Sequence, residues 1–314
     1  MDPTALPAVL LMGPTASGKS GLALRLAQHF PIEIISVDSA QVYRGMDIGT
    51  AKPDAAEQAA VPHHLIDILD PLEAYSAARF VGDAVRLVDE IRGRGRLPLL
   101  VGGTMLYFRA LRFGLSDLPS ADPAVRARIE AEARRDGWPA LHRRLQRLDP
   151  LTAQRLHPND QQRIQRALEI IELSGVSASA AFAQPISGAG SLKLLPLALS
   201  PPLRSVLHAR IERRFETMMR QGFLDEVRAL YRRGDLGPEL PSIRSVGYRQ
   251  LWAHLAGECT LDEAVARAVA ATRQFAKRQL TWLRSDPDAE VFDPEAPDLL
   301  SSVVARIVRA ERQA

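Results

Sequence analysis

The sequence of 314 residues contains a single cysteine, Cys259, so no disulfide can form within the chain. A disulfide-stapled scaffold is therefore excluded, and nothing indicates an oxidising compartment. No apolar run approaches the roughly 20 residues that a membrane span needs, and the first residues lack the basic segment of a secretory signal. We therefore expect a cytoplasmic protein that does not interact with membranes.

Lysine and aromatic residues are also scarce. Only four of the 40 basic residues are lysines, and aromatic residues make up 5% of the chain. The hydrophobic content of 46% and the charged content of 25% are ordinary for a globular protein, which excludes collagen and long disorder. Residues 203–284 carry 15 basic and 9 acidic residues, a net charge of +6. This surplus indicates either solvated helix surfaces or a surface for a polyanion, and composition leaves both open.

Apolar segments that alternate with helical patterns indicate the fold class. Residues 8–12 and 97–101 are short and apolar, residues 32–37 are rich in β-branched side chains, and all three segments predict strands. Because helical spacing of apolar residues separates them, the pattern predicts an α/β fold with a doubly wound parallel sheet. Residues 192–199 would add a further strand, in which Pro196 favours an edge or a strand end.

The length suggests about two domains. Residues 121–184 are helical in pattern and rich in arginine, and they begin with a capping aspartate followed by proline. We expect them to form a helical insertion in a P-loop catalytic domain made of residues 1–120 and 185–314, which ends in basic helices. Small and turn-forming residues predict a flexible connector at 174–191.

A glycine-rich segment follows the first predicted strand and opens a helix. It fits the pattern G-x-x-x-x-G-K-[ST] with Gly13, Pro14, Thr15, Ala16, Ser17, Gly18, Lys19 and Ser20. Its backbone N–H groups can converge on one phosphate chain, and the helix N-terminus adds partial positive charge. Lys19 supplies a full charge, and the Ser20 hydroxyl can ligate Mg²⁺. The segment therefore predicts a site for a diphosphate or a polyphosphate.

The neighbouring residues leave the identity of this ligand open. If it were ATP, Asp38 at the end of the second strand would be a metal ligand of a kinase or NTPase. The third strand, however, ends in Gly102, Gly103 and Thr104 and offers no second carboxylate. A polar loop, residues 38–53, leaves the second strand at the edge of the sheet where open α/β proteins bind ligands.

Six stretches of the chain, taken in order, resemble one known family. They are GPTASGKS, ISVDSAQVYRGMDIGTAKP, VGGTMLYFRAL, HPNDQQRIQRALE, LPSIRSVGYRQLW and TRQFAKRQLTWLR, and they span about residues 9–284. In these stretches the chain resembles the bacterial tRNA dimethylallyltransferases, also called tRNA isopentenyltransferases. The resemblance implies a P-loop kinase-like fold whose loop holds dimethylallyl diphosphate rather than ATP.

The resemblance implies a reaction and its participants. A dimethylallyl group would pass from dimethylallyl diphosphate to the exocyclic N6 amine of the adenosine on the 3′ side of the anticodon, with release of diphosphate. The target base would be flipped out of the anticodon loop, and the helical insertion would close over the anticodon stem-loop of the tRNA. We expect Mg²⁺ as the cofactor and a monomer as the active form.

The resemblance also implies roles for individual residues. Asp38 matches a general base that takes a proton from the amine, and Thr104 matches a residue near the amine and the diphosphate. Arg214 matches an arginine that binds the diphosphate together with residues 13–20. Arg210, one turn earlier, is a second candidate whose alternative is a solvated position.

Contacts with tRNA are implied in three parts of the chain. The expected residues are Asp38, Ser39, Ala40, Gln41 and Thr104 near the strand ends; Arg126, Gln162, Arg163, Ile164, Gln165 and Arg166 in the insertion; and Arg244, Ser245, Val246, Gly247, Tyr248, Arg249, Lys277, Arg278, Gln279, Leu280, Thr281, Trp282, Leu283 and Arg284 in the C-terminal helices. A surface ion pair remains the alternative for each arginine, and a place in the core remains the alternative for the tryptophan.

Other functions remain as alternatives at this point. A small-molecule kinase would leave the arginine-rich insertion unexplained, a prenyltransferase of free adenine nucleotides would not need it, and a pure RNA-binding module would not need the P-loop. Rejection of ATP would depend on the space beyond the second phosphate, which we expect to be shaped by Asp38, Gln41, Thr104 and Met105. The adjacent His63 and His64 lack further metal ligands at suitable spacing, so we expect a structural role for them.

Overall fold

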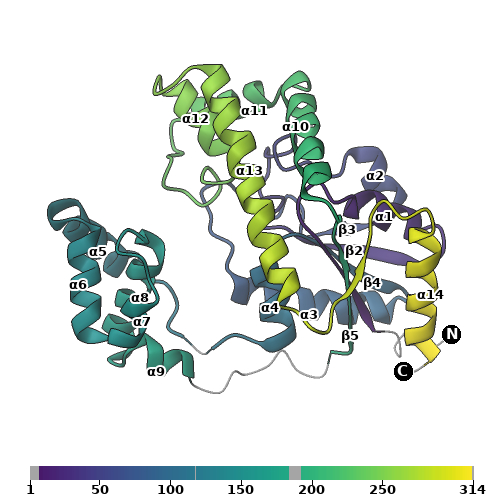
Figure 1. Ribbon diagram of the computed structural model, residues 1–314, viewed down its shortest axis with the longest axis horizontal. Helices are drawn as coiled ribbons and strands as arrows, with labels where there is room; N and C mark the ends of the chain where they lie inside the picture. The colour runs from purple at the N-terminus through teal and green to yellow at the C-terminus, as the bar shows by residue number, and fades with distance from the viewer. Residues whose placement is uncertain (1–6, 117, 184–191, 313–314) are drawn as a thin grey trace. The chain divides into compact units, whose positions relative to one another are not determined.

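The computed structural model describes residues 7–116, 118–183 and 192–312 of the chain (Figure 1). In these residues a six-stranded sheet has the order β3-β2-β4-β1-β5-β6, and every neighbouring pair is parallel. The strands are β1 Ala8–Met12, β2 Ile32–Val37, β3 His63–His64, β4 Leu97–Gly102, β5 Leu194–Leu199 and β6 Glu290–Phe292. The predicted α/β class with a parallel sheet is confirmed.

The chain folds into two compact units. The first comprises Met1–Arg112 and Ala189–Ala314, and the second comprises Phe113–Gly188. The first unit contains the helices α1 Lys19–Leu26, α2 Ala55–Ala60, α3 Ala77–Gly93, α4 Met105–Phe113, α10 Arg204–Arg220, α11 Phe223–Arg232, α12 Tyr248–Leu255, α13 Leu261–Arg284 and α14 Leu299–Arg312. Of these, α4 extends one residue past the boundary of the unit.

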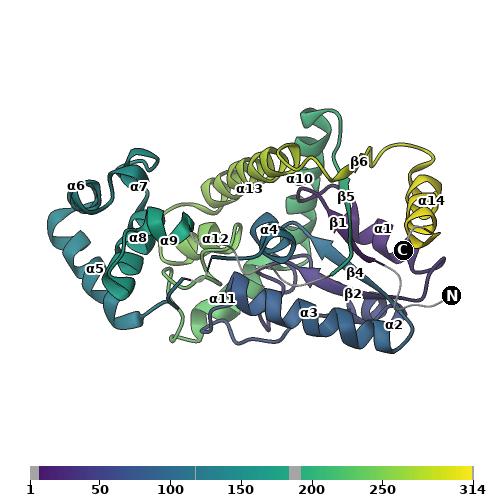
Figure 2. The same ribbon diagram turned by 90° about the horizontal axis from the view of Figure 1, so that it is seen from below.

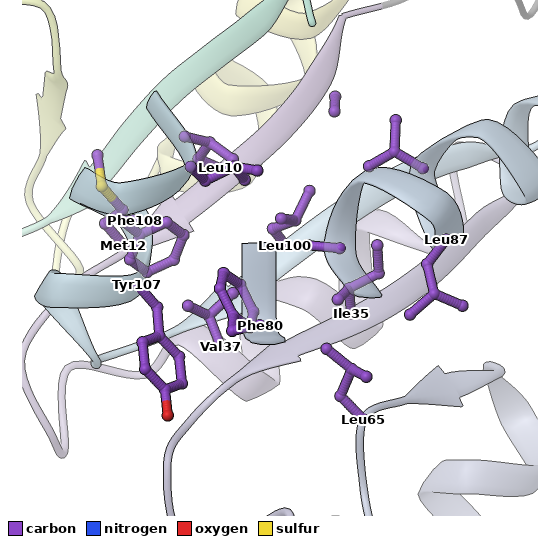
Figure 3. Close-up of a cluster of buried hydrophobic side chains, with 14 of the residues drawn as sticks. Leu10, Met12, Ile35, Val37, Leu65, Phe80, Leu87, Leu100, Tyr107 and Phe108 are labelled. Carbon is purple, nitrogen blue, oxygen red and sulfur yellow. The ribbon is translucent and has the colours of Figure 1, made fainter. Parts of the chain in front are cut away.

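Helices cover both faces of the sheet because successive side chains of a strand point to opposite faces. Leu10 of β1 packs in one cluster with Phe80 of α3 and Phe108 of α4, as Figure 3 shows. Val9, the preceding residue of β1, belongs instead to the opposite cluster, which includes Leu22 of α1. The second cluster also contains residues of α14, which lies beside α1 (Figure 2). A strand buried on both faces has no polar side, which explains the uninterrupted apolar sequence of β1.

Pro196 lies in β5, which pairs with β1 on one side and with β6 on the other. It is the register partner of Leu10, whereas the ladder with β6 begins only at Leu197. The proline therefore occupies a part of the strand where one side has no ladder, and its missing N–H group leaves no neighbouring strand unpaired. The expectation of an edge or a strand end for Pro196 is nevertheless wrong, because Pro196 is the third of the six residues of an interior strand.

A separate group of helices packs against the loop that follows β2. Val42 and Met46 of that loop are buried together with Phe215 of α10, Phe223 of α11 and Tyr248 of α12. This third cluster holds the loop from the side of the C-terminal helices, and it fixes the position of residues near the strand ends.

The second unit contains its own helices and core. The helices are α5 Pro123–Asp136, α6 Trp138–Leu148, α7 Pro150–Gln154, α8 Gln161–Ser174 and α9 Ala178–Ala183. Asp122 caps α5 as expected, because its side chain accepts a hydrogen bond from the Val125 N–H. The interior contains Ile129, Leu141 and Ile164.

The predicted connector at 174–191 is wrong in part. Residues Ala178–Ala183 form α9, and Ala178 and Ala181 are buried in the core of the second unit. Small side chains allow this short helix to approach its neighbours closely, so their abundance reflected packing rather than flexibility. Residues 184–191 lie outside the described part of the chain.

A helix that crosses a lipid bilayer must be both long and apolar, and this criterion can be applied to the described helices. In the described residues, none of them is both long and apolar enough to cross a membrane.

Candidate active site

The segment 13–20 forms a tight loop between β1 and α1. Gly18 has φ of 90° and Ala16 has φ of 61°, so the loop uses the left-handed region at two positions to curl its backbone. A Cβ atom on Gly13 would lie 2.7 Å from the Ser17 hydroxyl oxygen and 2.8 Å from the Leu199 carbonyl oxygen. Only glycine fits at that point, because β5 passes directly beside the loop.

Some N–H groups of this loop are used within the protein and others are free. The Ser17 N–H donates to the Pro14 carbonyl over 3.2 Å, and the Thr15 N–H donates to the side chain of Gln279 over 2.9 Å. The free donors among the described residues, which make no hydrogen bond there, are the N–H groups of Ala16, Gly18, Lys19 and Ser20. They surround the N-terminus of α1, where the helix dipole also favours an anion.

Lys19 folds back over the same loop. Its Nζ atom donates to the carbonyl oxygens of Gly13 at 2.9 Å and Pro14 at 2.7 Å. The pKa of Lys19 is lowered to about 7, first by burial and then by the charge of Arg214, while the charge of Asp38 acts in the opposite direction. A lowered pKa means that the charged form of Lys19 lacks stabilising partners, so a bound anion would stabilise it.

Asp38 stands directly after β2, and its carboxylate is held by the turn that follows. The Asp38 Oδ1 atom accepts a hydrogen bond from the Ala40 N–H at 2.9 Å. The next residue, Ser39, donates its N–H to the Thr104 hydroxyl at 3.1 Å. The Thr104 N–H in turn donates to the Val37 carbonyl at 3.2 Å. Thr104 thus links the ends of β2 and β4 and holds the backbone on both sides of Asp38 in place.

Arg214 brings a second positive charge to the site from α10. Its guanidinium is half-buried and donates to the Thr50 carbonyl over 3.5 Å. Burial lowers the pKa of Arg214, and the nearby Asp38 carboxylate counteracts this shift. Arg210, one turn away, forms an ion pair with Glu295 at 3.3 Å, so it has a partner that Arg214 lacks among the described residues.

These groups converge on one cleft of about 1340 Å³. Its lining includes Lys19, Asp38, Gln41, Arg210 and Arg214. Small-ligand pockets usually measure roughly 300–1,000 Å³, so the cleft has room for more than a small diphosphate. Its lining combines basic groups with carboxylates, and the Asp38 carboxylate is near enough to Lys19 and Arg214 to influence the pKa of both.

Two expected neighbours of the cleft do not line it. Thr104 and Met105 are absent from its walls, and Met105, the first residue of α4, is buried in the core. The expectation that they shape the space beyond the second phosphate is therefore wrong for this structure. Met105 begins the helix that packs on the sheet, Thr104 directly precedes it, and the Thr104 hydroxyl already accepts the Ser39 N–H.

Several residues expected to contact tRNA are exposed. Arg244, Arg249, Lys277 and Arg284 are exposed, and none of them has an ion-pair partner among the described residues. Trp282 is 37% exposed, and the guanidinium of Arg109 lies over its ring at 5.4 Å from the centroid. The other expected residues with at least partly exposed side chains are Ser39, Ala40, Gln41, Gln162, Arg163, Gln165, Ser245, Val246, Arg278 and Thr281.

Other expected tRNA contacts have buried positions, and for their side chains the expectation needs correction. The buried residues are Ile164, Gly247, Tyr248, Gln279, Leu280 and Leu283. They lie at helical spacing beside exposed ones, because one face of each helix must pack on a core. Arg126 and Arg166 also have structural partners, since both bind the buried carboxylate of Glu169 at 2.8 Å and 2.6 Å.

Glu226 is an important residue that sequence reasoning missed. Its carboxylate accepts hydrogen bonds from the N–H groups of Asp47 at 2.9 Å, Ile48 at 2.7 Å and Gly49 at 3.1 Å. A Cβ atom on Gly49 would overlap the ring of Phe223, so the loop and α11 fit closely. No local pattern in α11 marks Glu226, because its partners are in a loop far away in the sequence.

His63 and His64 have the structural role that we expected. His63 Nδ1 lies 2.7 Å from the Val61 carbonyl, and His64 Nε2 lies 2.6 Å from Glu33. Among the described residues there is also no group of three or more His, Cys, Asp and Glu side chains that could hold a metal ion.

Comparison with known proteins identifies the family. The family model described as IPP transferase matches residues 41–286, and the one described as isopentenyl transferase matches residues 7–67. The tRNA dimethylallyltransferase of Ralstonia nicotianae is 60% identical over 312 residues, which cover 98% of this chain and 96% of the relative. The chain belongs to the IPP transferase family. The tRNA dimethylallyltransferase of Bordetella petrii is also 60% identical, over 97% of this chain and 98% of its own.

Solved structures of IPP transferase relatives agree with the fold. The tRNA isopentenylpyrophosphate transferase of Bacillus halodurans is 40% identical, with a TM-score of 0.71 over 98% of this chain and 97% of its own. A eukaryotic dimethylallyltransferase, described as acting on tRNA, is 29% identical, with a TM-score of 0.74 over 95% of this chain and 77% of its own. The family inferred from six sequence stretches is confirmed, and the kinase interpretation of the P-loop is set aside.

Proposed function

We propose that this protein transfers a dimethylallyl group from dimethylallyl diphosphate to the N6 amine of the adenosine on the 3′ side of the anticodon in tRNA, with release of diphosphate. The observation that carries the proposal is the convergence of Asp38 with Lys19, Arg214 and the free loop amides on one cleft. Asp38 offers a proton acceptor, and Lys19, Arg214 and the loop amides offer donors and positive charge for a diphosphate. Two relatives that match this chain over nearly their whole length are named tRNA dimethylallyltransferase.

The chemistry requires both the proton acceptor and the anion-binding groups. A bond forms between N6 and the terminal carbon of the prenyl chain while the bond from that carbon to the diphosphate oxygen breaks. The electron pair of the broken bond leaves with the diphosphate, and the amine loses one proton. Adenine N6 is a weak nucleophile because its lone pair is delocalised, so a carboxylate that accepts this proton lowers the barrier. We assign this role to Asp38.

Departure of diphosphate places negative charge on its bridging oxygen. The ammonium of Lys19, the guanidinium of Arg214 and the loop N–H groups can stabilise that charge as it develops. Arg214 reaches the cleft unpaired among the described residues, whereas the Glu295 partner of Arg210 reduces its free charge. We therefore assign the main arginine role to Arg214.

The residues present are compatible with Mg²⁺. The Ser20 side chain is exposed at the start of α1 and makes no hydrogen bond among the described residues. Mg²⁺ prefers oxygen ligands and usually keeps several waters and substrate phosphates in its shell, so one hydroxyl beside a diphosphate suits it. The ion would add positive charge next to the leaving group when bound.

The exposed basic residues support tRNA as the second substrate. Arg244, Arg249, Lys277 and Arg284 would neutralise backbone phosphates, a contribution that salt weakens. We propose that the helical segment 121–184 is an insertion that clamps the anticodon stem-loop. We also propose that a monomer is active, in the cytoplasm, where tRNA is modified.

The test is a tRNA modification assay with purified protein. Unmodified tRNA, Mg²⁺ and dimethylallyl diphosphate are incubated with and without ATP, and the tRNA is digested and analysed by mass spectrometry. The proposal requires a prenylated adenosine at the expected position without ATP. Strict dependence on ATP, or ATP hydrolysis stimulated by tRNA without prenyl transfer, would contradict it.

A further inference from the structure

Gln279 is a buried side chain that links three segments of the fold. It lies on α13, is only 3% exposed, and uses both ends of its amide. Its Oε1 atom accepts the Thr15 N–H at 2.9 Å, and its Nε2 atom donates to the Gly103 carbonyl at 2.8 Å. A Cβ atom on Gly103 would overlap Nε2. The amide is thus fitted between the phosphate loop and the end of β4.

The hydrogen bond from Thr15 changes what the phosphate loop can offer to a ligand. Thr15, Gly103 and Gln279 all line the cleft, so the loop amide taken by Gln279 is one that a phosphate chain could otherwise use. With Ser17 also bonded internally, the remaining donors cluster at the N-terminus of α1. These few adjacent N–H groups can bind a diphosphate but leave no donor at Thr15 for a further phosphate.

Gln279 would also repel a triphosphate that extended toward Thr15. Its Oε1 atom is an acceptor, and phosphate oxygens are acceptors as well. A third phosphate lying against Thr15 would lose its solvation and meet an oxygen dipole instead of an N–H donor. An unmatched polar contact in a desolvated site is costly.

We propose that Gln279 is a specificity-determining residue that makes this P-loop select a diphosphate over a triphosphate by occupying the Thr15 amide. This inference rests on the proposed function, because it assumes that the loop binds the diphosphate of the substrate. It assigns the discrimination to a side chain of α13 and not to the loop sequence, which has the same pattern as ATP-binding loops.

The proposal is tested by binding of two inorganic probes to the full-length protein with Mg²⁺. Isothermal titration calorimetry gives Kd for pyrophosphate and for tripolyphosphate, and the ratio of the two is the readout. In Gln279→Ala the Thr15 N–H is released, and we expect the preference for pyrophosphate to fall by about tenfold, the scale of one hydrogen bond to a charged group. An unchanged ratio would overturn the proposal.

A matched control lies on the same helix. Gln274 is exposed on α13, so Gln274→Ala removes the same side chain without touching the loop and should leave the ratio as in the wild type. Gln279→Met retains most of the volume while losing both hydrogen bonds. A ratio that shifts in the alanine variant but not in the methionine variant would contradict a role for the Thr15 hydrogen bond.

A measurement on the wild type keeps the proposal testable if the variants do not fold. Hydrogen exchange at the Thr15 N–H should be slow without any ligand and should not slow further with pyrophosphate, whereas the N–H groups of Gly18 and Lys19 should become protected. Fast exchange at Thr15 that pyrophosphate slows would overturn the proposal. If the wild type bound neither probe, the diphosphate loop and this inference would both fail; prenyl transfer with an unchanged ratio would contradict Gln279 alone.

Discussion

Tyr248 donates a hydrogen bond from its hydroxyl to the Glu226 carboxylate over 2.5 Å. The same carboxylate accepts three consecutive N–H groups from the loop after β2, so this pair joins α11 and α12 to the loop that begins with Asp38. Burial raises the pKa of Tyr248, and the charge of Glu226 and the hydrogen bond to it raise it further. Tyr248 therefore remains a hydrogen-bond donor at any pH of interest.

We predict that Glu226→Gln slows prenyl transfer without loss of diphosphate binding. The amide has one acceptor oxygen where the carboxylate has two, so the loop should lose part of its anchor and Asp38 its fixed position. Misplacement of about 1 Å typically costs up to about 100-fold, and we expect kcat to fall by about 10- to 100-fold. Single-turnover kinetics and pyrophosphate calorimetry check this, with the exposed neighbour Asp225→Asn as the control.

We predict that Asp38→Asn retains binding of both substrates and loses most turnover. The amide is nearly the same size as the carboxylate but cannot accept the proton from N6. Loss of a general base costs about 10²- to 10⁴-fold. Filter binding with tRNA and calorimetry with the donor should match the wild type, and a near-normal single-turnover rate would remove Asp38 from this role.

The pKa of about 7 for Lys19 predicts that diphosphate binding takes up protons. Near pH 8 most of the free protein carries neutral Lys19, and a bound anion raises its pKa, so binding must add a proton. Affinity for pyrophosphate should therefore fall as pH rises above about 7. Calorimetry in two buffers of different ionisation enthalpy measures the uptake.

Lys19→Ala provides the control for that measurement. The proton uptake in the neutral to weakly alkaline range should disappear, apart from the part contributed by pyrophosphate itself. The same change should raise KM for the prenyl donor and lower kcat, because Lys19 stabilises both bound and departing diphosphate. Equal proton uptake in both proteins would assign the effect to another group.

We predict that Arg126→Ala destabilises the second unit more than it weakens RNA binding. Glu169 is fully buried and accepts hydrogen bonds from Arg126, Arg166 and the Asp122 N–H. Removing one donor from a buried carboxylate costs roughly 1–3 kcal/mol. Thermal unfolding should show this loss, whereas the exposed Arg163→Ala should leave Tm almost unchanged. An unaltered Tm with weakened tRNA binding would favour a direct RNA contact for Arg126.

The pH dependence of this unit has a definite sign. Burial raises the pKa of Glu169, and the hydrogen bonds from Arg126 and Arg166 outweigh it, so the net shift is downward. A carboxyl group with a lowered pKa stabilises the fold above its unfolded pKa, and that contribution is lost as the pH falls. The second unit should therefore lose stability in acid more steeply in the wild type than in Arg126→Ala.

We predict that replacing residues 121–184 by a short Gly/Ser linker leaves a folded sheet domain that no longer modifies tRNA efficiently. The two units have separate cores, and the P-loop and Asp38 belong to the first. Pyrophosphate binding should persist while kcat/KM for tRNA falls. Retention of wild-type efficiency on tRNA would exclude a clamping role for the insertion.

The sequence by itself determined the strands, the loop and the family. The segments 8–12 and 32–37 became β1 and β2 as predicted. β1 is apolar throughout because it is buried on both faces, whereas β2 also buries Glu33 and Ser36, whose side chains have hydrogen-bond partners. The phosphate loop was recognisable because the spacing of its glycines and lysine follows from local backbone geometry. The two-residue strand β3 was missed, since His63 and His64 pair with β2 only through tertiary contact.

Only the tertiary structure decided which side chains face the ligand and which support it. Gln274 and Gln279 are two glutamines on one helix, yet one is exposed and the other bonds a loop 264 residues away in the sequence. Nothing local distinguishes them, because the rotation of α13 is set by the packing of its apolar face. The same holds for Tyr248, which local sequence placed on an RNA surface and which packing buries against Glu226. Periodicity within a segment is a property of the sequence, whereas the partner of each face is chosen by the whole fold.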